Sequence, residues 1–155
     1  MAGHERTGLT VEWCTPKSVF DALGVTFDLD VAAPEGRKTH VPCKQQLTKD
    51  SLTHPWHGFV WMNPPWGHLQ PWIEKFIKHK NGIALLPARP ERLWFQAGAA
   101  QVDEILFANG RFRYERVDGS IGDSPMVGSC FFGIGSKAIE AFNNAQSLGL
   151  RMRRV

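Results

Sequence analysis

The chain has few cysteines, no long apolar run, and no internal repeat or low-complexity linker. Its three cysteines, Cys14, Cys43 and Cys130, are odd in number and widely spaced, which argues against a disulfide framework and favours a reducing compartment. No apolar stretch approaches the roughly 20 residues that a membrane-spanning helix needs. Residues 1–10 also lack the apolar core of a secretion signal. We therefore expect a soluble cytoplasmic protein with no membrane partner.

Metal-binding patterns are sparse as well. His40 and Cys43 are three residues apart, as are His54 and His57, but no second pair of cysteines accompanies them. Cys14 has no His and Asp partners that the sequence fixes. We expect neither a metal site nor a catalytic cysteine.

The composition is that of an ordinary globular protein. We expect one domain, 1–155, in which residues 1–11 are flexible and residues 151–155 form a basic tail. Hydrophobic residues make up 43% of the chain and charged residues 21%, and the net charge of +3 permits nucleic-acid binding without demanding it. Several of the six tryptophans lie in polar or proline-rich segments, where they can stack on a ligand.

Apolar periodicity and turn-forming residues predict helices and strands that alternate along most of the chain. Thr15 is predicted to cap a helix that starts at Pro16 and ends at Gly24. Residues 37–57 are polar, contain two prolines and are expected to be mostly loop. The other expected elements are strands at 27–31, 58–62, 83–86 and 105–107, helices at 69–80, 91–98 and 136–147, and two hairpin arms at 111–114 and 127–134. This order predicts an α/β fold with a mostly parallel sheet and an antiparallel edge hairpin.

The most informative motif is Asn63-Pro64-Pro65-Trp66, which follows the apolar run 59–62. The prolines forbid a continued strand ladder and fix the backbone. The motif therefore places an amide side chain, main-chain carbonyls and an aromatic face at the carboxyl end of a strand, where open α/β sheets bind ligands. Such a corner can bind a planar ring with an exocyclic amine, because Asn63 and a proline carbonyl accept its hydrogens while Trp66 stacks on its face.

Six segments, in this order, resemble the phage-type DNA N6-adenine methyltransferases, and the resemblance runs from about Glu12 to Gly135. The segments are Trp13-Cys14-Thr15-Pro16, Asp28-Leu29-Asp30-Val31-Ala32-Ala33, Asp50-Ser51-Leu52 with Trp56, Asn63-Pro64-Pro65-Trp66, Leu85-Leu86-Pro87-Ala88-Arg89 with Trp94-Phe95, and Gly110-Arg111-Phe112-Arg113. The resemblance implies a minimal, Rossmann-like class I methyltransferase sheet, S-adenosylmethionine as the cofactor, and the cytoplasm of a bacterium or a phage-infected host.

The resemblance also assigns a cofactor site. It comprises Trp13, Thr15, Pro16, Asp30, Ala32, Ala33 and Asp50. Thr15 and Pro16 would lie beside the methionine end, and Asp30 with the alanine turn would form the first cofactor loop, where a carboxylate suits the cationic ammonium and sulfonium. Asp50 would accept from the cofactor's adenine amine; alternatively, it holds the ribose hydroxyls, as an acidic residue about 20 positions after the first loop does in dinucleotide folds.

Two positions depart from the family pattern. The first loop reads Ala-Ala-Pro-Glu-Gly, with Gly36 as its only glycine, so the backbone has less freedom to approach a cofactor. The corner motif ends in Trp66, where Tyr or Phe is commoner, which offers a larger stacking face.

The implied reaction is methyl transfer to the N6 of an adenine that has been flipped out of duplex DNA. Asn63 Oδ1 and the Pro64 carbonyl would accept the two amine hydrogens and localise the nitrogen lone pair, with Pro65 and Trp66 completing the catalytic corner. Candidate DNA contacts come from Arg89, Arg92, Arg111 and Arg113, together with Arg116, Arg151, Arg153 and Arg154 and a groove-probing loop at 117–126.

Two other functions remain open from the residues. The corner motif also suits an enzyme that methylates another planar amine, such as cytosine N4, RNA adenine or a glutamine side chain. The glycine-poor loop favours a DNA-binding protein that has kept the fold and lost turnover, whereas the presence of Asp30, Asp50 and Asn63 argues against it. A chain of this length has no room for a separate recognition domain, so we expect relaxed or very short sequence specificity, and a homodimer is one way to add DNA contacts. The residues themselves establish neither.

Overall fold

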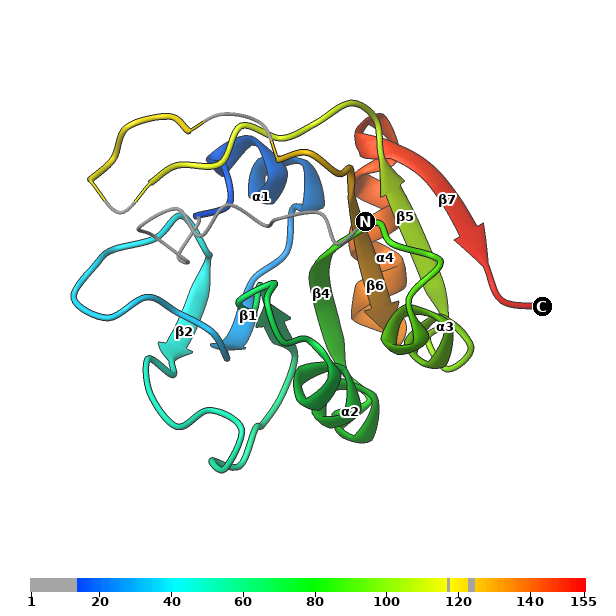
Figure 1. Cartoon of the computed structure of the whole chain (residues 1–155), viewed down its shortest axis with the longest axis horizontal. Coiled ribbons are helices and arrows are strands. Elements are labelled where there is room, and N and C mark those ends of the chain that lie inside the picture. Colours follow the sequence, from blue (N-terminus) through cyan, green and yellow to red (C-terminus); the bar gives the residue numbers. More distant parts are fainter. Residues whose placement is uncertain (1–13, 117, 123–124) are drawn as a thin grey trace, which may run out of the picture.

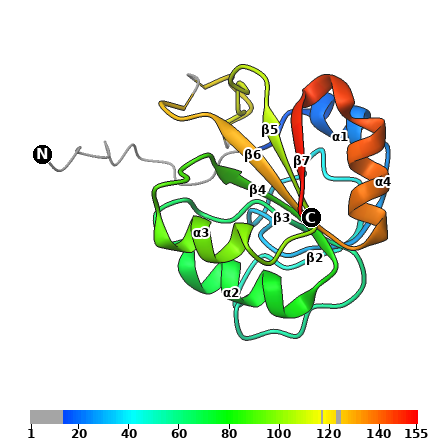
Figure 2. The ribbon, with the colours of Figure 1, turned by 90° about the vertical axis from the view of Figure 1, so that its right-hand side faces the viewer.

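The computed structural model describes residues 14–116, 118–122 and 125–155, in which one sheet lies between two layers of helices (Figures 1 and 2). The strands within these ranges have the order β2-β1-β3-β4-β6-β5-β7. They are β1 (Phe27–Asp30), β2 (Cys43–Gln46), β3 (Val60–Met62), β4 (Gly82–Pro87), β5 (Glu104–Ala108), β6 (Ser129–Ile134) and β7 (Gly149–Arg153). The helices are α1 (Lys17–Leu23), α2 (Gln70–His79), α3 (Leu93–Ala99), α4 (Ser136–Asn144) and the 3-10 turn η1 (Gln146–Leu148).

The sheet is parallel in its first half and antiparallel in its second. β1 pairs in parallel with β2 and β3, and β3 pairs in parallel with β4. β6 runs antiparallel to both β4 and β5, so β5 has the same direction as β4. The carboxyl ends of β1 to β5 therefore meet at one end of the sheet, which we call its carboxyl end; the opposite end is the amino end. The predicted α/β class is confirmed.

Residues 37–57 are mostly loop, as predicted, but four of them form a strand that the sequence did not indicate. β2 (Cys43–Gln46) pairs with β1, with Phe27 opposite Cys43 and Leu29 opposite Gln45. Its three polar residues, from Lys44 to Gln46, are exposed because β2 is an outer strand with one neighbour. The strand is held by its backbone pairing with β1 and by polar side-chain contacts such as that of Lys44 with Asp28, so no apolar alternation reveals it in the sequence.

The predicted edge hairpin is also wrong. Residues 111–114 form no strand, and β6 lies inside the sheet between β4 and β5. The outer strand on this side is β7, which contains Arg151 and Arg153 of the expected basic tail. Residues of the 109–116 segment instead cross over to the start of the chain, where Glu115 pairs with Cys14. In Figure 1 this segment passes above α1.

Alternation along the strands divides the core between the two faces of the sheet. On one face, Phe59, Trp61 and Phe131 pack with apolar residues of α1 and α4. On the other face, Val60 and Met62 pack with α2 and α3 residues. Figure 2 shows the same division, with α2 and α3 on one side of the strands and α1 and α4 on the other. This arrangement buries β3 on both faces, and so fixes the position of the corner motif that follows it.

The start of α1 differs from the prediction. Pro16 has extended geometry and occupies the N-cap position, with no side-chain capping hydrogen bond, so Thr15 does not cap the helix. The predicted end is confirmed, because Gly24 has a left-handed φ of 63°. The unused Thr15 hydroxyl contacts another segment, described below. Within the described ranges, no helix has the length and apolar character that crossing a membrane requires.

Candidate active site

The strand order reverses between β1 and β3. From β1 the chain moves outward to β2 and then returns to β3 on the other side of β1. In open α/β sheets, a ligand binds beyond the carboxyl ends of the strands at this switch point. Asp30 is the last residue of β1 and Asn63 directly follows β3, so two of the predicted site residues lie at this position.

Asp30 is a buried carboxylate, with 3% of its surface exposed. Its Oδ1 accepts a hydrogen bond of 3.1 Å from the backbone N–H of Ala32. Within the part of the chain that the structure describes, no Lys, Arg or His forms an ion pair with it. Burial raises the pKa of Asp30 to about 7, against a smaller lowering effect of the Ala32 hydrogen bond. A cation placed here would stabilise the ionised form.

The alanine turn after Asp30 is fixed to the end of β2. Leu47 donates its N–H to the carbonyl of Asp30 at 2.8 Å, and Ala33 donates to the carbonyl of Leu47 at 3.1 Å. Ala33 is buried and Ala32 is half-buried. The turn is therefore defined by backbone hydrogen bonds, which explains how it keeps its shape with few glycines.

Asp50 lies on an exposed turn whose carbonyl groups accept hydrogen bonds from side chains of other segments. It has a left-handed φ of 53°, a conformation that aspartate tolerates better than most residues. Lys75 of α2 donates to three carbonyls of this turn, those of Ser51, Leu52 and His54. Trp56 Nε1 also donates to the Ser51 carbonyl, at 3.0 Å. Trp56 thus supports the Asp50 turn.

Asn63 contacts Thr15, which is far away in sequence. Its Nδ2 donates to Thr15 Oγ1 at 3.2 Å, and Thr15 is 4% exposed. Thr15 is held in turn by its neighbour Cys14, whose N–H and carbonyl both bond to the backbone of Glu115, at 2.9 and 3.0 Å. Pro16 is half-buried beside it. The predicted cofactor residue Trp13 lies outside the described residues.

Trp66 is half-buried and braced by an aromatic residue that sequence reasoning missed. The ring of Tyr114 meets that of Trp66 edge to face, with centroids 5.8 Å apart. Tyr114 is 3% exposed and its hydroxyl lies 2.8 Å from Ser129 Oγ. Burial raises the pKa of Tyr114, so it is a neutral phenol. Within the motif, Pro64 is buried and Pro65 is exposed.

A cavity of about 220 Å³ adjoins Trp66 at the carboxyl ends of β3 and β4. Arg89 and Arg92 line it, as does Trp94, a residue to which the sequence gave no role. The structure therefore brings together Trp66, Arg89 and Arg92. It leaves Arg111 and Arg113 on the exposed surface of the 109–116 segment, outside this cavity.

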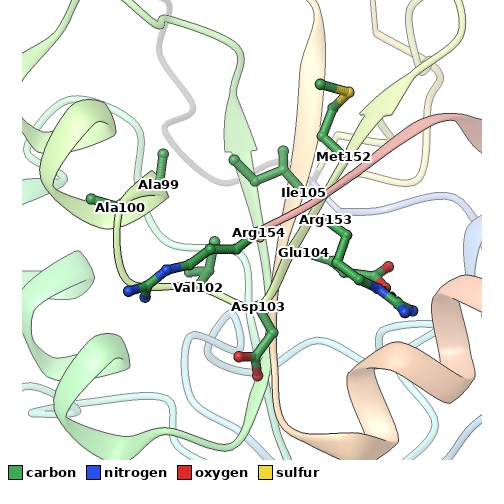
Figure 3. A pocket seen from close by; sticks show the side chains of 9 residues that line it. All are labelled: Ala99, Ala100, Val102, Asp103, Glu104, Ile105, Met152, Arg153 and Arg154. Atoms are coloured by element: carbon green, nitrogen blue, oxygen red, sulfur yellow. Dashed lines mark hydrogen bonds and ion pairs between the residues drawn. The ribbon is translucent and has the colours of Figure 1, made fainter.

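A second cavity, of about 250 Å³, lies at the opposite end of the sheet (Figure 3). Its lining includes Glu104 at the start of β5 and Arg153 at the end of β7. None of the predicted catalytic or cofactor residues lines it. Within residues 14–116, 118–122 and 125–155, no group of three or more His, Cys, Asp or Glu side chains is placed to hold a metal ion.

Comparison with known proteins assigns the family. No curated protein matches the chain. A family model described as DNA N-6-adenine-methyltransferase (Dam) matches residues 5–129, a range that includes every predicted catalytic, cofactor and DNA-contact residue named above up to Arg116. The chain therefore belongs to the DNA N-6-adenine-methyltransferase (Dam) family, and it is an enzyme that methylates the N6 of adenine in DNA.

Proposed function

We propose that the chain transfers a methyl group from S-adenosylmethionine to an adenine flipped out of DNA, at the carboxyl end of the sheet between β1 and β3. The observation that carries this proposal is the Asn63 amide, which is oriented by Thr15 at the same end of the sheet as the buried Asp30. The strand order, with its reversal at β1, supports a Rossmann-like class I methyltransferase sheet.

The residues around Asp30 fit this cofactor chemically. A buried carboxylate whose pKa is raised to about 7 gains most from a cationic ligand, and the cofactor carries an ammonium and a sulfonium. We assign Asp30, Ala32 and Ala33 to the first cofactor loop and Thr15 and Pro16 to the methionine end. Bound S-adenosylmethionine would supply a methyl group already activated by the sulfonium.

Asp50 completes the proposed cofactor site. Its turn follows directly from the β2 end that is bonded to Asp30, and its exposed carboxylate accepts from a hydroxyl or an amine. Two roles therefore stay open for it, acceptance from the cofactor's adenine amine and acceptance from the ribose hydroxyls. Binding of a 2′,3′-dideoxy cofactor analogue separates them, because Asp50→Ala loses affinity for that analogue only in the first case.

Asn63 and Pro64 are proposed to hold the target amine. Because Asn63 Nδ2 donates to Thr15, its Oδ1 is directed away from Thr15 and is the atom that we assign to the N6 hydrogens. Pro64 and Pro65 have no N–H groups, so at these two positions the backbone offers carbonyl acceptors alone. Accepting both amine hydrogens favours a pyramidal nitrogen with a localised lone pair. Catalysis then rests on positioning, and no dedicated base or metal is needed.

The DNA contacts are proposed to surround this corner. Flipping the base costs a few kcal/mol, and stacking on Trp66 returns about 1–3 kcal/mol. Arg89 and Arg92 beside Trp66, and Arg111 and Arg113 on the facing segment, supply cationic groups for phosphates. Cytoplasmic location in a bacterium or an infected host, and a homodimer, remain predictions; size-exclusion chromatography with and without DNA tests the dimer.

The test is methylation with tritiated S-adenosylmethionine on duplex DNA, RNA and protein, followed by nucleoside analysis. We expect N6-methyladenine in DNA, and for Asn63→Ala a turnover about 10³-fold lower, comparable to the loss of one preorganised transition-state contact, with cofactor affinity within twofold. Label in RNA or protein only, or in cytosine N4, would refute the proposed substrate. DNA binding without any label would favour a non-catalytic role.

A further inference from the structure

The cavity beside Trp66 has the chemistry of a nucleotide site. It shares Trp66 with the corner motif, but Asn63, Pro64 and Pro65 do not line it. Two indole rings line it from different segments, Trp66 after β3 and Trp94 in α3. Two arginines, Arg89 and Arg92, line it as well. Asn63 is not among its described lining residues, so an occupant would lie next to the target base and not in its place.

The arginines at this cavity are held only loosely by carboxylates. Glu91 lies 3.9 Å from Arg89 and 4.0 Å from Arg92, and its side chain is 64% exposed. Ion pairs this long and exposed are weak and are screened by salt, so a phosphate can replace them. The charge balance of the cavity is therefore cationic, which complements DNA.

The apolar part of the cavity suits the flat face of a base. Leu69, Pro87 and Val127 contribute to the lining together with the two tryptophans. The volume of about 220 Å³ is below the range of about 300–1,000 Å³ typical of pockets for drug-sized ligands. Aromatic platforms beside a cationic groove are how proteins hold unpaired nucleotides without reading their sequence.

We propose that this cavity holds the nucleotide next to the target adenine, with its base stacked on Trp94 and its phosphate against Arg89 and Arg92. This inference depends on DNA being the substrate, as membership of the DNA N-6-adenine-methyltransferase family shows. Trp94 is thus a DNA-binding residue that acts during base flipping, when the neighbour of the extruded adenine loses its own stacking partner. Trp94 strengthens DNA binding and takes no part in the methyl-transfer step.

The test compares Trp94→Ala, Trp94→Phe and the control Leu93→Ala on a duplex with one adenine that the wild type methylates. Leu93 is the neighbouring α3 residue, is 86% exposed and lies outside the cavity. We expect Trp94→Ala to raise KM for DNA about tenfold, the size of one lost stacking contact. We also expect kcat and cofactor affinity to stay within twofold, Trp94→Phe to restore most of the loss, and Leu93→Ala to behave as the wild type.

A double-mutant cycle separates stacking from a general structural role. An abasic nucleotide is placed on either side of the target adenine, and melting temperatures confirm that the variants are folded. If Trp94 stacks on the neighbouring base, the Trp94→Ala and abasic effects are non-additive at one of the two positions. Full additivity at both positions, or an unchanged KM for Trp94→Ala, overturns the inference. If the wild type itself is inactive on all DNA, the failure is that of the proposed function and not of Trp94.

Discussion

Two carboxylates in this protein are almost equally buried, yet their surroundings are opposite. Glu104, at the amino end of the sheet, is 2% exposed, and Asp30, at the carboxyl end, is 3% exposed. Glu104 accepts hydrogen bonds from Arg151 Nη2 at 2.7 Å and from Arg153 Nε at 2.6 Å, which ties β7 to β5. Figure 3 shows Arg153 beside Glu104. Among the described residues, Asp30 accepts a hydrogen bond from the backbone N–H of Ala32.

The difference separates a structural carboxylate from one held ready for a ligand. A buried charge destabilises a fold unless it is paired, and Glu104 is paired twice. Asp30 instead carries a pKa raised to about 7, so its ionisation opposes folding until a cation arrives. The amino end is built for stability, whereas the carboxyl end gives up some stability for binding.

The largest expected effect on stability comes from removing the arginine partners of Glu104, which leaves it unpaired like Asp30. The double substitution Arg151→Met with Arg153→Met leaves a buried carboxylate without partners and should lower the free energy of unfolding by about 3–5 kcal/mol at pH 8. Urea denaturation measures it, with exposed Leu150→Ala on the same strand as the control. An unchanged stability at pH 8 would mean that the arginines do not compensate the burial of Glu104.

The converse change at the carboxyl end should stabilise the protein. The folded-state pKa of Asp30 is above its value of 3.8 in the unfolded chain, so its contribution to stability is complete below pH 4 and is lost as pH rises through 7. Asp30→Asn removes this titration and keeps an acceptor for Ala32. The variant should therefore be more stable than the wild type by roughly 2–4 kcal/mol at pH 8, and nearly equal to it at pH 4. If Asp30→Asn were no more stable than the wild type at pH 8, the ionised Asp30 carboxylate would not destabilise the folded protein.

A smaller effect, on turnover and not on stability, is expected from Thr15→Val. The valine keeps the shape of the buried residue and removes the acceptor of Asn63 Nδ2, so kcat should fall about tenfold, the worth of one hydrogen bond. Thr15→Ser should restore most of the rate, and the melting temperature should change little. Because Thr15 also lies at the proposed methionine end, cofactor affinity is measured separately, and the fall in kcat should persist at saturating cofactor. A loss of cofactor affinity with kcat retained would show that the hydroxyl serves the cofactor and does not position Asn63.

The residues that sequence reasoning located correctly are those that end a buried strand. The run 59–62 leading to Asn63 is apolar throughout, and the run leading to Asp30 has Asp28 as its one polar residue. The strands β1 and β3, and the polar residue that ends or follows each, are therefore visible in the sequence. β2 was missed because its exposed residues are polar and show no apolar alternation. The hairpin was misplaced because the apolar run in 127–134 predicts a strand but not its neighbours.

Contacts between distant segments were beyond the reach of the sequence. The Thr15–Asn63 hydrogen bond joins residues 48 positions apart, and local patterns gave Thr15 a sufficient role as a helix cap. Tyr114 braces Trp66 from a segment without regular structure, where no periodicity marks a buried side chain. Trp94 lay in a segment that resembles the family, but only the folded chain brings it to the same cavity as Trp66.

The most direct test of the cationic-ligand role of Asp30 is the dissociation constant of S-adenosylmethionine at pH 6 and pH 8, measured by calorimetry. If the cofactor binds the ionised form of a carboxyl with a pKa of about 7, only about a tenth of the sites are competent at pH 6, and the affinity should be about tenfold weaker there. Asp30→Asn should bind more weakly than the wild type at pH 8 and show little change between the two pH values. Equal wild-type affinity at pH 6 and pH 8, or tighter binding at pH 6, would contradict the assignment of Asp30 to the cationic cofactor.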